Sequence, residues 1–177
     1  GDAGGRALGS CDPMTAGPDG LAFLALGYQS LADRTPDQAA RLNARANQLV
    51  ERLISWSETS GSMVSWRGEQ TWSYGLEATA RALEALLRVR PSEPRIPGVV
   101  RYLLARRTGD AWSSTRDTAQ ALNALCVHLG QTGETKSQYD LELRLDGETV
   151  ARATFAPGAP NQALAFDRPL REIPVGK

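Results

Sequence analysis

A run of eight residues occurs twice in the chain, and this repeat limits the available folds more than any other feature. Residues 79–86 read TARALEAL, and residues 118–125, 39 positions later, read TAQALNAL. Each copy follows a Trp-Ser pair, which begins at Trp72 and at Trp112. A helical unit that repeats at about 40 residues is typical of stacked helix pairs, since one pair cannot bury its own apolar face. The repeat therefore predicts a mainly α fold, as a helix-pair solenoid or a closed α/α toroid.

Capping residues and apolar periodicity predict where the helices begin. Asp19 can cap the first helix, and Thr35 with Gln38 forms a capping box for the second. Ser114, with Asp117 three residues on, has the spacing of a capping box for the fifth. The second to fifth helices are predicted over 36–57, 76–88, 98–107 and 116–129, with a loop over 58–74.

The 3.6-residue period also predicts which residues of each helix face inward. In chain order these are Leu21, Leu24, Tyr28 and Leu31; Leu42, Ala46, Leu49, Leu53 and Trp56; Leu76, Thr79, Ala80, Leu83, Leu86 and Leu87; Val99, Val100, Leu103 and Leu104; and Ala119, Leu122, Leu125, Cys126 and Leu129.

The pattern changes to that of strands after a glycine-containing linker at 130–133. Residues 139–145 alternate strictly between apolar and polar, and Asp146-Gly147 is a strong hairpin signal. A return strand runs through Val150 and Phe155, and a third strand is predicted near 163–166. Three strands in about 40 residues cannot bury an independent core, so they belong to a larger β-domain or lean on the helices. We therefore predict two partial domains, 1–133 and 137–177.

The charge and apolar content exclude several classes of protein. The formal net charge is zero, whereas nucleic-acid modules normally carry a basic excess. Apolar residues make up 41% of the chain, too many for a disordered tail. No apolar run approaches the roughly 20 residues of a spanning helix, so no membrane insertion is expected. The chain has no initiator Met, and we expect it to be a segment of a longer protein.

The sequence offers no catalytic set and predicts neither a cofactor nor a metal. His128 is the only histidine and is expected to cap or pack, since one His and two distant Cys lack metal-ligand spacing. Cys126 lies in an apolar helical run and is expected to be a buried free thiol, with a disulfide to Cys11 as the alternative. No phosphate-binding glycine loop or G-x-S-x-G elbow occurs.

Two local clusters have a structural and a functional interpretation. Six arginines, at positions 88, 90, 95, 101, 106 and 107, surround Glu93 as the only acid. They are expected to form a solvated face that pairs with Asp110 and other acids, with a surface for an acidic partner as the alternative. The aromatic loop at 66–74 is expected to plug the end of a helical barrel, and alternatively lines a substrate cavity.

The segment 101–122 resembles one family. Its helix 101–107 and the W-S-S-T-R-D-T stretch at 112–118 are similar to the end of the thioester-containing domain of alpha-2-macroglobulins, especially bacterial ones. The segment 76–80 resembles the family's upstream helix, and the loop at 66–74 resembles the entry to that helix, so the likeness covers roughly 40–155. The resemblance implies an α/α toroid followed by a β-domain. It also implies an extracytoplasmic parent protein that traps proteases, with those proteases and its own neighbouring domains as partners.

Within the matched motif the expected roles are structural. Trp112 would anchor the loop, and Ser114 or Thr115 would cap the helix. Asp117 would place a negative charge at the positive N-terminal end of the helix, and Thr118 follows it in the motif. The family's Cys-Gln thioester motif is missing, because Cys11 is followed by Asp-Pro-Met and the Gly-Glu-Gln at 68–70 follows an arginine. No chemistry is therefore assigned to this segment. The alternatives are an α/α-barrel enzyme of the terpenoid cyclase or prenyltransferase type, whose acid motif and zinc set are absent, and a helical scaffold.

Overall fold

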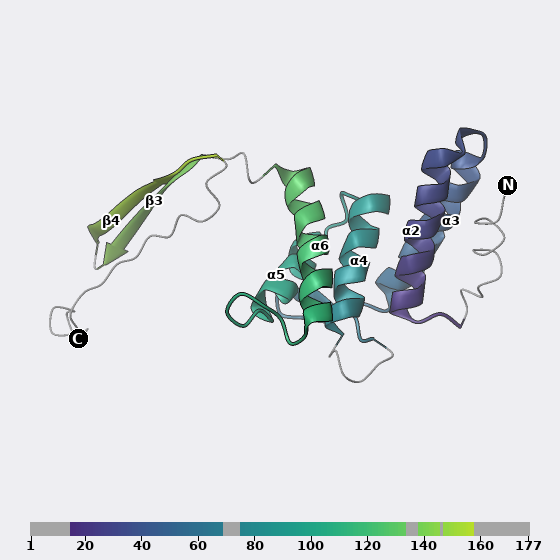
Figure 1. The fold of residues 1–177 in the computed structure, drawn as a ribbon. Coiled ribbons are helices and arrows are strands. Elements are labelled where there is room, and N and C mark those ends of the chain that lie inside the picture. The colour runs from purple at the N-terminus through teal and green to yellow at the C-terminus, as the bar shows by residue number, and fades with distance from the viewer. Residues whose placement is uncertain (1–14, 69–74, 134–137, 146, 158–177) are drawn as a thin grey trace. The chain divides into compact units, whose positions relative to one another are not determined.

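A computed structural model describes residues 15–68, 75–133, 138–145 and 147–157 (Figure 1). The chain divides into two compact units, Gly1–His128 and Leu129–Lys177. The first unit is helical, and the second contains an antiparallel hairpin. The predicted fold class, mainly α with a short antiparallel β segment after the helices, is confirmed. Closure of the helices into a toroid stays a prediction.

The helical unit is built from helix pairs. Its helices are α2 (Pro18–Arg34), α3 (Ala39–Ser55), α4 (Leu76–Val89), α5 (Ile96–Ala105) and α6 (Thr115–Thr132), with a 3-10 turn η1 at Pro36–Gln38. In Figure 1, α2, α4 and α6 run in the same direction, and α3 and α5 carry the chain back between them. The pairs α3–α4 and α5–α6 are the two copies that the 39-residue repeat predicts. None of the described helices is long and apolar enough to cross a membrane.

The first two predicted helix caps are wrong. Helix α2 begins at Pro18, one residue before Asp19, with Gly17 at the N-cap and no side-chain cap. Proline suits this first position because its missing N–H would have no partner there. Thr35 donates its hydroxyl to the carbonyl of Leu31, at 2.6 Å, instead of capping the next helix. A threonine hydroxyl can satisfy a nearby carbonyl in this way, and the second helix consequently starts later, after η1.

The segment predicted as a loop contains a small hairpin, β1 (Glu58–Ser60) and β2 (Met63–Ser65), which pair antiparallel. This hairpin packs on α5. A Cβ added to Gly98 would lie 2.9 Å from Cγ2 of the buried Val64, and Arg101 donates to the carbonyl of Ser62 at 3.0 Å. The aromatic residues Trp72 and Tyr74 lie outside the described residues.

Leucine, alanine, valine and two tryptophans form one core between the helices. The inward face predicted for α4 is confirmed in full, since all six of its residues are buried. Trp56 and Leu104, predicted to face inward, are instead about half exposed. Trp56 lies at the C-cap of α3, where the chain turns towards β1. Leu104 is rotated by about 100° from the buried Leu103 along α5, so it points away from the core.

In the second unit, β3 (Tyr139–Leu145) pairs antiparallel with β4 (Glu148–Phe155). The register shifts between Leu143 and Arg144, which marks the bulge. Tyr139 stacks on Phe155 with ring centroids 4.8 Å apart. The apolar face that carries Tyr139 and Leu143 is exposed in the described residues, and the predicted third strand at 163–166 lies outside them.

Candidate functional site

Trp112 links the two helices of the second pair. Its indole N–H donates to the carbonyl of Leu103 near the end of α5, at 2.8 Å. Its backbone N–H donates to Oγ1 of Thr118 in α6, at 3.0 Å, and that hydroxyl donates to the carbonyl of Ser114 at 2.8 Å. Trp112 is only 7% exposed. These contacts form what we call the Trp112–Thr118 bracket, which fixes α5 and α6 to the loop between them.

The same segment caps α6. Oγ of Ser114 accepts the backbone N–H of Asp117 at 3.0 Å, the N-cap bond, and Thr115 is the first helical residue. The Asp117 carboxylate is buried and accepts the hydroxyl of Ser113 at 2.7 Å. Its place in the first turn puts a negative charge at the positive end of the helix dipole. Ser114, not Thr115, therefore occupies the N-cap, and these bonds hold the start of α6 in place.

A second bracket joins the first helix pair. The indole N–H of Trp66 donates to the carbonyl of Leu53 in α3, at 2.6 Å, and its backbone N–H donates to Oγ1 of Thr79 in α4, at 3.0 Å. Trp66 therefore occupies the place that corresponds to Trp112. The sequence repeat pointed to Trp72 because its spacing to the threonine is closer to that of Trp112. Trp66 precedes Thr79 by 13 residues, whereas Trp112 precedes Thr118 by six.

Gly75, which the sequence reading did not single out, makes the Trp66–Thr79 bracket sterically feasible. It has φ +77°, and a Cβ at this position would lie 2.1 Å from the carbonyl oxygen of Trp66. Any side chain would therefore collide with the backbone of the residue that the bracket holds. The left-handed φ adds strain for every residue except glycine. The sequence signal that could have identified this position is a glycine directly before a predicted helix.

Polar contacts between successive pairs join positions 39 residues apart. Arg116 donates to Glu77 at 2.8 Å, and Asn123 donates to Glu84 at 2.6 Å. Each of these two contacts connects a residue of α6 to its equivalent in α4. Arg90, at the C-cap of α4, pairs with Glu51 of α3 at 3.0 Å, and this contact lies within the first pair. The repeat is thus visible in the side-chain contacts as well as in the sequence.

The inward face predicted for α6 is wrong for most of its residues, although Leu125 does pack against the core. The residues that α6 buries are Asp117, Ala121 and Ala124. Leu122 is 48% exposed, Ala119 and Cys126 are exposed, and Leu125 and Leu129 are only half-buried. The Trp112–Thr118 bracket and the contacts of Arg116 and Asn123 with α4 set the rotation of α6, so its largest apolar side chains do not decide which face turns inward.

Cys126 is an exposed free thiol, which corrects the expectation that it is buried. The alternative disulfide partner, Cys11, lies outside the described residues. Within the described ranges, no group of three or more His, Cys, Asp and Glu side chains could hold a metal ion. His128 is half-buried, and its Nδ1 has no hydrogen-bond partner among the residues that the structure describes.

Among the described residues, the carboxylate of Glu142 on the hairpin has a shifted pKa. Hydrogen bonds from Thr149 and Arg144, with a further hydrogen bond and the charge of Arg152, hold the pKa of Glu142 below its ordinary value. All these groups lie on the polar face of an exposed two-stranded hairpin. A lowered carboxylate pKa keeps the group ionised at neutral pH, which suits an ion pair and not a general acid.

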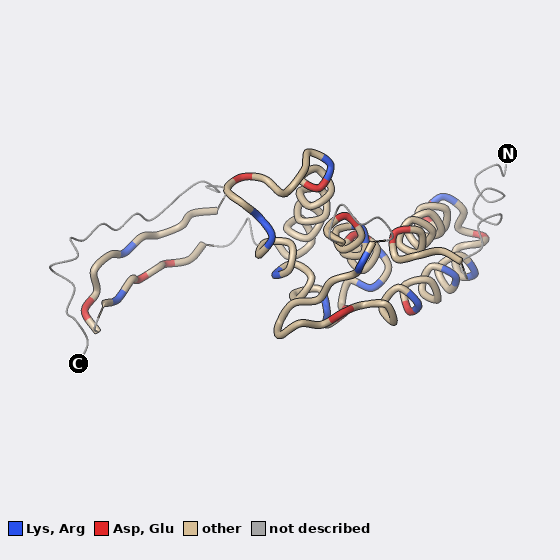
Figure 2. Tube along the Cα trace, turned by 90° about the horizontal axis from the view of Figure 1, so that it is seen from below, with Lys and Arg blue, Asp and Glu red and all other residues tan. Residues whose placement is uncertain are grey.

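The arginine-rich segment pairs with nearby groups. Arg90 pairs with Glu51 and Arg95 with Glu93. The described residues show no ion pair to Asp110, contrary to expectation. Figure 2 shows basic and acidic residues mixed along the helices. This mixture agrees with a solvated face.

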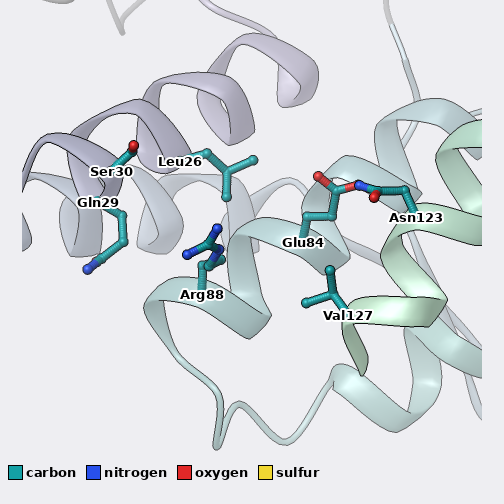
Figure 3. A pocket seen from close by; sticks show the side chains of 7 residues that line it. All are labelled: Leu26, Gln29, Ser30, Glu84, Arg88, Asn123 and Val127. Carbon is teal, nitrogen blue, oxygen red and sulfur yellow. The ribbon is translucent and has the colours of Figure 1, made fainter. Parts of the chain in front are cut away.

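An open cavity of about 330 Å³ lies between α2, α4 and α6 (Figure 3). Its lining residues are Leu26, Gln29, Ser30, Glu84, Arg88, Asn123 and Val127. Trp66 does not line this cavity and is buried in the core. That the loop at 66–74 plugs the end of a barrel stays a prediction, because 69–74 lie outside the described residues.

Comparison of the chain with models of known protein families and with curated proteins found no match. The resemblance to alpha-2-macroglobulins therefore stays a prediction that rests on the residues quoted above.

Proposed function

We propose that this chain is a structural segment of an alpha-2-macroglobulin-like protease trap that works outside the cytoplasm. The observation that carries the proposal is the Trp112–Thr118 bracket. The stretch on which the resemblance rests is the one that ties α5, the connecting loop and α6 together. The order of helix pairs followed by a β hairpin also agrees with the organisation that the resemblance implies.

In this proposal the segment contributes a rigid body and no chemistry of its own. The brackets at Trp66 and Trp112 tie each helix pair internally, and the ion pair between Arg116 and Glu77 ties one pair to the next. A packed helical body of this kind transmits a displacement without deforming. Cleavage of the parent protein by a protease would then move the helical unit against its neighbouring domains. Proteases and those neighbouring domains are the proposed partners.

The test is a protease-entrapment assay on the full-length protein that carries this chain. A trapped protease keeps its activity on a small chromogenic peptide but loses activity on a large protein such as casein, because the trap blocks access without touching the active site. We expect this difference, together with a change in sedimentation rate on cleavage. Equal inhibition on both substrates would indicate an active-site inhibitor and would contradict the proposal. The control is the same protein unfolded by heat.

A helical scaffold is the second candidate, and the exposed apolar residues of α6 favour it. Leu122 and Cys126 form a stripe with Ala119 that a permanent solvent face would not need. A scaffold predicts no change in activity on either substrate and no change in sedimentation after protease treatment. The assay therefore separates the two candidates.

A further inference from the structure

The cavity of about 330 Å³ between α2, α4 and α6 is lined by side chains from all three parallel helices. In Figure 3, Arg88 rises from α4 towards Leu26 and Gln29 of α2, while Glu84 points the other way, towards Asn123 of α6. Pockets for small ligands commonly begin at about this volume. The cavity lies entirely within the helical unit and is separate from both brackets.

Arg88 offers its guanidinium group to the cavity. Within the described ranges it forms no ion pair, although Glu84 precedes it by four residues on the same helix. The spacing alone does not prevent a pair, because Arg81 pairs with Glu77 at 3.0 Å two turns earlier on α4. Glu84 instead accepts the side-chain amide of Asn123 at 2.6 Å, and in Figure 3 its side chain points towards α6 and away from Arg88. Arg88 therefore remains available to the cavity.

The rest of the lining supplies hydrogen-bond donors and a short apolar wall. The amide of Gln29 and the hydroxyl of Ser30 come from α2, and Leu26 and Val127 come from α2 and α6. Arginine binds carboxylates through two parallel N–H bonds, which gives both energy and orientation. A ligand that suits this lining therefore has one carboxylate and a short aliphatic group.

We propose that this cavity binds a carboxylate attached to a short aliphatic chain, with Arg88 as the group that binds the carboxylate. In the site, Ser30 donates to a remaining oxygen lone pair, and Leu26 and Val127 contact the aliphatic carbons. The amide nitrogen of Gln29 already donates to Oδ1 of Asp33 at 3.1 Å, so only its second N–H serves the ligand. Two sources share this chemistry, the acidic side chain of a bound peptide and a free organic acid. Rows of stacked helices offer extended surfaces on which peptides bind, so binding of an acidic peptide is tested first.

Isothermal titration calorimetry with the whole 177-residue chain tests the proposal. The probes are N-acetyl-glutamyl-leucine amide, its glutaminyl counterpart and 4-methylpentanoate. We expect the glutamyl peptide to bind with a Kd of about 1 mM and the glutaminyl peptide about tenfold more weakly, because a neutral amide loses the charge-assisted bonds. If 4-methylpentanoate binds as tightly as the glutamyl peptide, a free organic acid is a sufficient ligand. If it binds more weakly than the glutamyl peptide, the ligand is the acidic side chain of a peptide.

Variants locate the site. Arg88→Gln should weaken the glutamyl peptide about tenfold, and Glu84→Gln should strengthen it about threefold because a like charge is removed. Arg45→Gln removes the same charge from an exposed position on α3 outside the cavity and should leave the affinity unchanged. Three results would each overturn the proposal. The first is that neither carboxylate probe binds at 10 mM, and the second is that the glutamyl and glutaminyl peptides bind equally. The third is that Arg88→Gln and Arg45→Gln change the affinity equally. Each variant's melting temperature checks that it is folded.

Discussion

Helices α4 and α6 contain nearly the same run of eight residues, which starts at the fourth position of each, yet they differ sharply in burial. In α4 the stripe Ala80, Leu83 and Leu87 is at most 3% exposed. The equivalent stripe of α6 is Ala119, Leu122 and Cys126, and all three are exposed. Each helix nevertheless carries a threonine that accepts the backbone N–H of a buried tryptophan.

The difference teaches that the repeated motif determines how a helix is anchored, while its neighbours determine what it buries. Helix α4 lies between α2 and α6 (Figure 1), and α3 and α5 also pack against it. The apolar side chains of α6 that are fully buried are small, Ala121 and Ala124, while Leu125 and Val127 are partly buried against the core. Two copies of one sequence run therefore form one central helix and one helix with an uncovered stripe.

The largest effect is expected from truncating the two equivalent leucines. Leu83→Ala should lower the free energy of unfolding by about 3 kcal/mol, because it leaves a cavity in the core. Leu122→Ala should lower it by less than about 1 kcal/mol, because Leu122 is 48% exposed. Urea denaturation of both variants measures the difference. Equal losses would mean that the stripe of α6 is as buried as that of α4.

The next largest effect tests the bracket of α4 through its glycine. Gly75→Ala should cost about 2 to 3 kcal/mol, because it combines a left-handed φ with a collision against the Trp66 carbonyl. Gly109 is the control, since its φ is +62° but nothing lies within 4 Å of a Cβ placed there. Gly109→Ala should cost only about 1 kcal/mol. If the two alanine variants unfold at the same urea concentration, the collision with Trp66 is not significant.

Removing the bracket hydroxyls compares the two helices directly. Thr79→Val should cost about 2 kcal/mol, because it leaves buried backbone groups of Trp66 without a partner. Thr118→Val should cost about 1 kcal/mol, because Thr118 is only half-buried. Thermal unfolding of the matched variants checks this order. The reverse order would contradict the burial difference between the two brackets.

The smallest effect concerns the cap of α6. Ser114→Ala should lower the free energy of unfolding by about 1 kcal/mol through loss of the N-cap bond to Asp117. Thr115→Ala is the control and should change it by less than about 0.5 kcal/mol, because Thr115 is an exposed first-turn residue. Chemical denaturation distinguishes the two, and equal losses would place the cap elsewhere.

The sequence predicted which segments are helical better than it predicted where each helix begins and which of its residues are buried. Helix α4 matches its predicted face because its leucines are both the largest apolar groups and the ones its neighbours cover. Helix α6 does not, because the contacts of Arg116 and Asn123 with α4 set its rotation, and a single-helix periodicity contains no such information. Ser114 is an N-cap as its spacing predicted, whereas the hydroxyl of Thr35 bonds the preceding helix.

The candidate site was predicted only in part. The motif residues around Trp112 were identified, but their counterpart Trp66 was missed, because a hairpin separates it from Thr79 and breaks the repeat spacing. The strands of that hairpin are three residues each, too short for an alternating pattern to appear. The cavity beside Arg88 is lined by side chains of α2, α4 and α6, which only the packed helices bring together.

Solvent exchange of the tryptophan indole protons tests the central claim, that Trp66 and Trp112 are equivalent anchors, most directly. NMR on the whole chain, with signals assigned by single Trp→Phe variants, should show slow exchange for Trp66 and Trp112, because both donate to helix carbonyls. Trp56, which is 49% exposed, should exchange rapidly and provides the internal reference. Exchange of the Trp112 indole as fast as that of Trp56 would contradict the account.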